Sequence, residues 1–162
     1  MQISSRFTVA VHIFSCMGHF GRDRRVTSDF LASSIGINPV VVRKILSMLH
    51  AAGLIDVARG TGGITLRKAP SGISFLDIFN ALGLIEDGKL FHFHEKPCPK
   101  CPVGANIHAV LDGRLAGVQK AMEAELSKST VQDIFDDTER IISGMAQDRS
   151  SPDGNQQARL RP

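Results

Sequence analysis

The chain of 162 residues has no tryptophan and no tyrosine, and 6% of its residues are aromatic. Proteins that bind single-stranded nucleic acid usually stack bases on aromatic side chains, so this class of function is disfavoured. Cysteine is also scarce, since Cys16, Cys98 and Cys101 are the three in the sequence. An odd and sparse set of thiols does not suggest a disulfide-stapled secreted scaffold, so we expect a reducing compartment.

The sequence lacks long apolar runs and the motifs of common enzymes. No run approaches the length of about 18 to 20 apolar residues that a membrane span needs, and the N-terminus does not have the layout of a signal peptide. We therefore expect a soluble, cytoplasmic protein with no membrane partner. Because no nucleophile, base and orienting acid form a recognisable arrangement, and no phosphate-binding Gly-x-x-x-x-Gly-Lys loop occurs, we expect no enzyme activity.

What the sequence does have is a basic N-terminal part. Residues 1–68 contain nine Lys or Arg and three Asp, a net charge of +6, whereas the remainder contains ten basic and thirteen acidic residues, a net charge of −3. This asymmetry is typical of a protein whose basic part faces a polyanion. A chance imbalance of surface charge is the alternative.

Residues 27–52 have the pattern of a helix-turn-helix. Thr27 predicts the N-cap of a short helix, and Gly36 predicts its end. Asn38 followed by Pro39 predicts the start of a second helix, which runs to about residue 52. Two short helices joined by a tight turn that contains glycine form a helix-turn-helix.

The second of these helices has the pattern of a recognition helix. Its predicted buried stripe consists of Val42, Ile45, Leu46 and Leu49. Its N-terminal half then presents basic residues to the outside, as a helix in the DNA major groove requires. The DNA-contact residues predicted in this region are Ser28, Asn38, Pro39, Val40, Val41, Arg43 and Lys44. The alternative is an ordinary amphipathic helix with a solvated cationic face.

A β-hairpin is predicted directly after the helix-turn-helix. Residues 53–59 and 64–68 have the pattern of two strands, and the glycine-rich segment 60–63 between them is the expected tip. Such a hairpin is a wing, and its glycines permit a close approach to phosphate. The wing residues predicted to contact DNA are Arg59, Thr61, Gly62 and Gly63.

The remaining periodic segments predict helices that flank this head. They cover residues 2–18, 74–82, 103–126 and 130–145, and a turn is expected at residues 18–25. The helix over 103–126 is too long for a small head and needs a partner. The predicted parts are a winged helix-turn-helix DNA-binding domain at 1–82, a cysteine-bearing loop at 83–102, a helical dimerisation arm at 103–146 and a disordered tail at 147–162. The expected fold class is α+β, mostly α.

Three segments resemble the Rrf2 family of winged-helix regulators. They are Arg59-Gly60-Thr61-Gly62-Gly63-Ile64-Thr65-Leu66, Ile73-Ser74-Phe75-Leu76-Asp77-Ile78 and, as in the YwnA-like branch, Cys101-Pro102-Val103-Gly104-Ala105-Asn106-Ile107. The resemblance covers about residues 1–145. It implies a homodimer that binds a palindromic double-stranded operator, usually as a repressor, with the long helix crossing its two-fold mate.

Some members of this family carry an iron–sulfur cluster held by three cysteines before the long helix. Cys98 and Cys101 alone stand in that region here, so a three-cysteine cluster is not carried over from the resemblance. Their Cys-x-x-Cys spacing is that of half a zinc site or of a redox dithiol. A metal would need further ligands, such as His12 from a partner chain. A regulator that senses through zinc or an iron–sulfur cluster at Cys98 and Cys101 is therefore an alternative and not the main expectation.

Thiol sensing gives the two cysteines a physical role. Cys101 directly precedes the long helix, whose dipole favours a thiolate, and Lys96 and Lys100 add positive charge. We expect that oxidation at Cys101 or Cys98 shifts the start of the dimer helix and weakens operator binding. The alternatives are inert loop cysteines, a metalloprotein or redox enzyme, and a winged helix used only for protein interactions.

Overall fold

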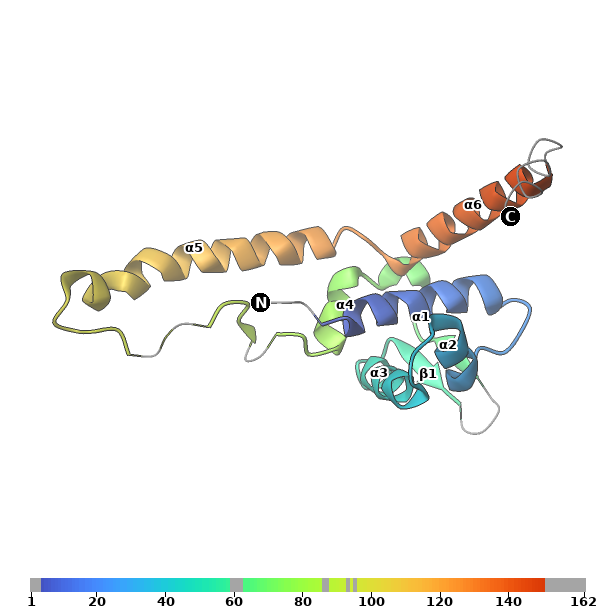
Figure 1. The fold of residues 1–162 in the computed structure, drawn as a ribbon, viewed down its shortest axis with the longest axis horizontal. Helices are drawn as coiled ribbons and strands as arrows, with labels where there is room; N and C mark the ends of the chain where they lie inside the picture. Colours follow the sequence, from blue (N-terminus) through green and yellow to red (C-terminus); the bar gives the residue numbers. More distant parts are fainter. Residues whose placement is uncertain (1–3, 59–62, 86–87, 93, 95, 151–162) are drawn as a thin grey trace, which may run out of the picture.

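The computed structural model describes residues 4–58, 63–85, 88–92, 94 and 96–150. Its elements in chain order are α1 (Arg6–Phe20), α2 (Ser28–Ile35), α3 (Pro39–Ala51), β1 (Ile55–Val57), β2 (Ile64–Leu66), the short 3-10 helix η1 (Pro70–Gly72), α4 (Phe75–Ala81), α5 (Pro102–Leu126) and α6 (Val131–Ser150). Helices α1 to α4 and the two strands form a head, and α5 extends from it as a long arm (Figure 1). This is the mostly α winged-helix architecture that the sequence predicts.

The predicted caps of the helix-turn-helix are confirmed. Thr27 Oγ1 accepts a hydrogen bond from the Phe30 N–H at 3.3 Å, and Gly36 ends α2 with φ 74°. Asn38 Oδ1 accepts from the Val40 N–H at 2.8 Å, so that α3 begins at the proline as expected. These caps are local, and they fix where both helices begin without help from the rest of the fold.

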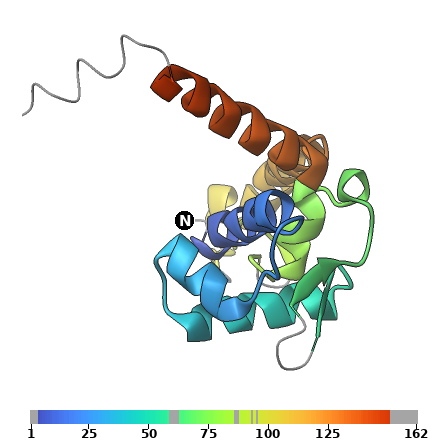
Figure 2. The ribbon, with the colours of Figure 1, turned by 90° about the vertical axis from the view of Figure 1, so that its right-hand side faces the viewer.

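The core of the head lies around α1. This helix lies between α6 on one side and the helix-turn-helix on the other (Figures 1 and 2). The predicted inward stripe of α3 is buried as expected. The largest fully buried side chains come from every part of the head and from the start of α6: Phe14, Ile13, Leu31, Ile45, Leu49, Ile55, Ile73, Ile78, Leu82, Val42 and Val131. The start of α6 is therefore part of the head.

The first helix is longer than the sequence predicts, and its glycine has another role. The turn was expected at residue 18, but α1 continues to Phe20. A Cβ atom at Gly18 would lie 2.4 Å from Cδ1 of Phe135, a side chain of α6. Gly18 therefore lets α6 approach α1 closely, and it does not end the helix.

The wing strands pair in antiparallel register. Ile55 pairs with Leu66, and Val57 pairs with Ile64. The Ala58 N–H donates to the Gly63 carbonyl at 3.0 Å, which continues the ladder toward the tip. Most of the predicted tip, residues 60–62, lies outside the described residues.

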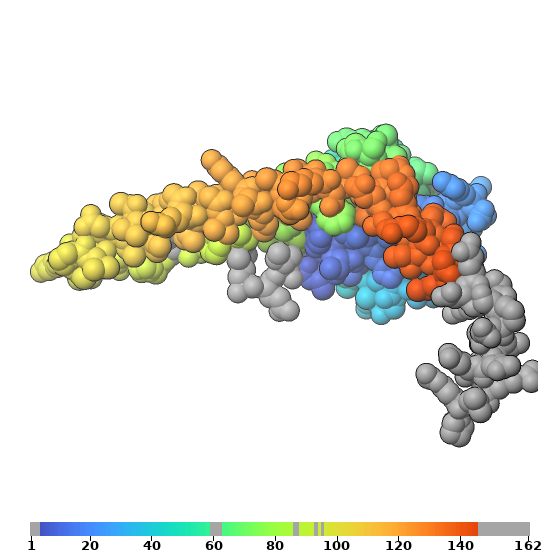
Figure 3. All heavy atoms as spheres, turned by 90° about the horizontal axis from the view of Figure 1, so that it is seen from above, coloured from blue at the N-terminus to red at the C-terminus, as the bar shows by residue number. Residues whose placement is uncertain are grey.

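The arm consists of α5 and the segment that precedes it. Gln119 of α5 holds this segment by accepting from the Leu90 N–H at 3.1 Å and donating to the Gly88 carbonyl at 2.9 Å. None of the 25 residues of α5 is buried. From above, the arm projects from the head as a narrow extension (Figure 3).

Helix α6 returns the chain to the head. The Val131 N–H donates to the Ile73 carbonyl and the Phe75 N–H donates to the Ser129 carbonyl, both at 2.9 Å. Asp133 Oδ2 accepts from the Thr130 N–H at 2.7 Å, and this bond lowers the pKa of the Asp133 carboxyl. The helix extends to Ser150, five residues beyond the predicted end at 145, so it includes the first residues of the segment predicted as a tail.

Of the described helices, none is by itself long and apolar enough to cross a membrane. Helices α2 and α3 pass that test only as a pair bent by 118°.

Candidate nucleic-acid interface

The N-terminal half of α3 presents an apolar and basic surface. Val40 is 66% exposed and Val41 is 42% exposed, although both are large aliphatic residues. Arg43 and Lys44 are exposed on the same half of the helix, while Val42 is buried. Exposed valines can contact thymine methyl groups, and the two cations can donate to guanine or to phosphate. This face therefore has the chemistry to read a major groove.

The other predicted contacts of the helix-turn-helix lie at the starts of the two helices. Asn38 and Pro39 are exposed at the N-terminus of α3, and Ser28 is half-buried at the start of α2. The side-chain oxygen of Asn38 already serves as a cap. Its side-chain NH₂ group is the part that has the chemistry to donate to DNA.

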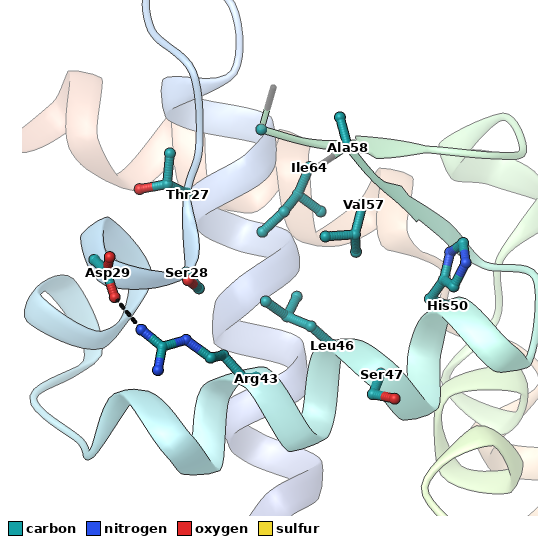
Figure 4. Close-up of a pocket in the computed structure, with 11 residues that line it drawn as sticks. Thr27, Ser28, Asp29, Arg43, Leu46, Ser47, His50, Val57, Ala58 and Ile64 are labelled. Atoms are coloured by element: carbon teal, nitrogen blue, oxygen red, sulfur yellow. Dashed lines mark hydrogen bonds and ion pairs between the residues drawn. The ribbon is translucent and has the colours of Figure 1, made fainter. Parts of the chain in front are cut away.

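A groove of about 520 Å³ separates α2 and α3 from the wing strands (Figure 4). Val57 and Ile64 line it from the strands. Its polar lining comes from the two helices and consists of Thr27, Ser28, Asp29, Arg43, Ser47 and His50. The recognition helix and the wing lie on the two sides of this groove, so one duplex can contact both.

Arg43 is held by an acidic residue that sequence reasoning missed. Its Nη2 atom lies 2.8 Å from Oδ1 of Asp29, so the pair joins α3 to α2 on the helical side of the groove (Figure 4). The side chains are 57% and 74% exposed, respectively. An acid in the first turn of a helix is ordinarily explained by the helix dipole, and no local sequence signal indicated this pair.

The root of the wing is tied to α3 by polar contacts. His50 Nδ1 lies 2.9 Å from the Ile55 carbonyl oxygen, and Arg67 Nη2 lies 2.9 Å from Asp56 Oδ1 on the opposite strand. The His50 contact connects α3 to the start of β1, and the Arg67–Asp56 ion pair joins the two sides of the hairpin.

Of the predicted wing contacts, the structure describes Gly63, which is buried beside the loop before α2 with φ 85°. A Cβ there would lie 3.4 Å from the Val26 carbonyl oxygen. The other three predicted wing contacts, Arg59, Thr61 and Gly62, lie outside the described residues.

A second basic segment lies beside the wing, where the sequence analysis expected a turn. Residues 22–25 contain three arginines and line a shallow hollow with Gly63 and Thr65. The Arg24 guanidinium lies over the rings of Phe20 and Phe30, at 5.2 and 5.3 Å from their centroids. These arginines were counted in the basic charge of residues 1–68 but were not predicted as DNA contacts, although three arginines within four residues are a signal for a basic patch.

The two exposed cysteines lie at the end of the arm that is remote from the head, where α5 begins (Figure 1). The backbone N–H groups of Gly104 and then Val103, at the start of α5, lower the pKa of the Cys101 thiol. The Cys101 N–H donates to the Cys98 carbonyl at 3.2 Å. A Cβ at Gly104 would lie 2.5 Å from that carbonyl oxygen, so glycine permits the Cys98 turn to fold against α5.

The described residues do not match a cluster or zinc site. Cys16 is buried in the head with its Sγ 3.5 Å from Ser34 Oγ, and His12 is exposed on α1. Within the part of the chain that the structure describes, no three His, Cys, Asp or Glu side chains are grouped so that they could hold a metal ion. Two thiols at Cys98 and Cys101 are too few for a cluster of three cysteine ligands.

Comparisons with known proteins agree with this geometry. Residues 3–137 match the family described as "Rrf2: Iron-dependent Transcriptional regulator". The chain is 40% identical over 133 residues to YwnA of Bacillus subtilis (strain 168), which is named as an HTH-type transcriptional regulator; the match covers 82% of this chain and 96% of YwnA.

Two solved structures are also similar. A crystal structure described as that of a DNA-binding protein is 36% identical, with a TM-score of 0.63 over 80% of this chain and 97% of the other. A transcriptional regulator from Lactobacillus plantarum is 26% identical, with a TM-score of 0.67. The match covers 90% of this chain and 97% of that regulator. The named relatives are transcriptional regulators, not enzymes, and the chain belongs to the Rrf2 family of DNA-binding transcriptional regulators.

Proposed function

We propose that this regulator acts in the cytoplasm as a homodimeric repressor of a palindromic operator. Each protomer places α3 in the major groove and its wing against the adjacent backbone. The main observation in favour of a homodimer is that α5 has apolar residues along its whole length and buries none of them within one chain.

The exposed apolar residues of α5 support a partner helix. Val103, Val110 and Val118 are 70%, 55% and 52% exposed. Burial of apolar surface contributes about 25 cal/mol per Å², so a helix that leaves these residues in water gains from a second apolar surface. A second copy of α5 supplies such a surface by two-fold symmetry.

Two glycines within α5 support the same conclusion. A glycine inside a helix costs about 1 kcal/mol relative to alanine. A Cβ at Gly113 or Gly117 would meet nothing within 4 Å, so the fold of one chain does not require glycine at either position. Residues four apart share a face of a helix, and on that face the two glycines permit another backbone to approach closely.

The DNA contacts follow from the exposed faces. Arg43 and Lys44 are the main contacts of α3, with Val40 and Val41 beside them, and the glycine-rich tip of the wing contacts phosphate. We assign further phosphate contacts to the arginines of residues 22–25. Because phosphate contacts release counterions, we expect operator affinity to fall steeply as salt increases.

The experiment combines operator selection with a matched pair of variants. Duplexes selected from a random pool by the purified protein should contain two inverted half-sites about 10 base pairs apart, and sedimentation should give a dimer. Gly113→Leu should produce monomers that bind the operator at least about tenfold more weakly. Gly144→Leu, at an open position on α6, is the control and should remain dimeric. A wild-type monomer, or an asymmetric selected site, would contradict the proposal.

We further propose that Cys101 and Cys98 make the regulator responsive to peroxide. The observation in favour is the lowered pKa of the Cys101 thiol. The Cys101 thiolate attacks one peroxide oxygen, forming a sulfenic acid and releasing hydroxide. The Cys98 thiolate then attacks that sulfur, forming a disulfide and releasing the sulfenic oxygen as hydroxide, which is protonated to water. The deciding measurement is operator affinity before and after oxidation.

A further inference from the structure

Asp29 places a negative charge inside a surface that binds a polyanion. It is the second residue of α2 and lines the groove between the recognition helix and the wing (Figure 4). Its carboxylate lies within 2.8 Å of the Arg43 guanidinium, the cation of α3 that faces this groove. Electrostatics alone would favour a neutral residue here, because a carboxylate repels DNA phosphate.

Local structure accounts for the acid only in part. The N-cap of α2 is Thr27, whose Oγ1 binds the Phe30 N–H, so Asp29 is not needed as a cap. Its charge at the helix N-terminus is only weakly favourable, because the site is exposed and the helix is short. The pair with Arg43 is exposed, and exposed ion pairs contribute little to stability because solvent screens their attraction.

We propose that Asp29 is a positioning residue that sets sequence specificity through Arg43. The carboxylate fixes the guanidinium on the DNA-facing side of the groove and engages Nη2. The remaining N–H donors of the guanidinium can then bind the O6 and N7 acceptors of a guanine. This inference rests on the proposed function, because it presupposes a specific duplex site.

The same carboxylate discriminates between the two classes of DNA acceptor. A guanine edge is uncharged, so Arg43 can bind it while the ion pair with Asp29 stays intact. A phosphate bound by Arg43 would bring a second negative charge next to the carboxylate, which is unfavourable by like-charge repulsion. Asp29 therefore disfavours binding of Arg43 to the backbone of any sequence and favours its binding to one base. The expected result is a larger ratio of specific to non-specific affinity.

The test is Asp29→Asn, with dissociation constants measured by fluorescence anisotropy for the selected operator and for a random-sequence duplex. The random duplex should bind at least about fivefold more tightly, and the ratio of specific to non-specific affinity should fall about tenfold. For the random duplex, the slope of log K, the association constant, against log salt concentration should become more negative by about one. The reason is that Arg43 gains a phosphate contact. Asp29→Glu keeps the charge and should restore most of the ratio.

Two controls separate this role from a general loss of negative charge. Glu125→Gln removes an exposed acid paired with Lys128 at 2.6 Å, on an element outside the groove, and should leave the ratio unchanged. In an Arg43→Ala background, Asp29→Asn should no longer change the ratio. If it changes the ratio as much as in the wild type, Asp29 does not act through Arg43 and the inference is wrong. If the wild type selects no specific duplex, the proposed function itself fails; an unchanged ratio in Asp29→Asn overturns only this inference.

Discussion

At the scale of single residues, the position of Cys101 directly before α5 sets the chemistry of its exposed thiol. Two backbone N–H groups at the start of α5 stabilise the thiolate of Cys101 and lower its pKa. A lowered pKa means that the thiolate, which is the reactive form, persists to lower pH. Cys101 should therefore react with electrophiles at lower pH than an ordinary exposed thiol.

We predict that Cys101 is alkylated at lower pH than an ordinary exposed thiol. In the Cys98→Ser protein, the rate of iodoacetamide alkylation at the arm should rise with pH to a midpoint below that of free N-acetylcysteine under the same conditions. Mass spectrometry of the modified peptide separates Cys101 from the buried Cys16. A midpoint no lower than that of free N-acetylcysteine would contradict the role of the Gly104 and Val103 N–H groups.

Among the elements, α1 and α6 form a close contact that is decided by one glycine. A Cβ at Gly18 would lie within 2.4 to 2.7 Å of three atoms of the Phe135 ring. The nearby His19 Nδ1 lies 2.8 Å from Glu139 Oε1 and holds the same two helices together. The packing of α6 on the head thus depends on the absence of a side chain at this one position.

We predict that Gly18→Ala destabilises the protein although alanine is the better helix former. Alanine gains about 1 kcal/mol in helix propensity, but overpacking typically costs about 1 to 3 kcal/mol. The free energy of unfolding, measured in urea, should therefore fall. Gly144→Ala is the matched control, because open space surrounds that position, and it should be neutral or stabilising. A stabilised Gly18→Ala would show that α6 does not pack on α1 as described.

Gly36, which ends α2, and Gly18, which contacts Phe135, show which features of the fold the sequence predicts and which it does not. The caps of α2 and α3 follow from local patterns, because Thr27, Gly36 and Asn38 act on backbone atoms within a few residues of themselves. Gly18 was interpreted by the same local rule and given the wrong role. Its contact with Phe135 joins residues far apart in the chain, and no local pattern encodes it.

In the candidate site, too, features set by local sequence were predictable and contacts between distant residues were not. The exposed face of α3 was predictable because helical periodicity separates Arg43 and Lys44 from the buried Val42 and Ile45. The contact between Arg43 and Asp29 was not predictable, because it depends on the angle between α2 and α3. That angle is set by the packing of both helices in the core.

For the whole molecule, the main question is how the end of the arm communicates with the DNA-binding face. Helix α5 has 25 residues, so Cys101 lies roughly 38 Å along the helix from the junction with α6. At that junction, backbone bonds attach the chain to Ile73 and Phe75 of the head. In the proposed dimer, a change at Cys101 acts most directly on the interface between the two copies of α5, because α5 buries none of its residues within one chain. We expect such a change to alter the distance between the two recognition helices.

We predict that oxidation weakens operator binding through this interface. Peroxide should raise the dissociation constant for the operator at least about tenfold, a coupling free energy of about 1.4 kcal/mol. Cys101→Ser should retain its affinity under the same oxidation, and dithiothreitol should restore the wild type. Cys16→Ser, which removes the buried thiol of the head, is the control and should respond as the wild type does. If Cys101→Ser loses the operator equally, or if the wild type retains its affinity once mass spectrometry shows the disulfide, the arm thiols do not control DNA binding.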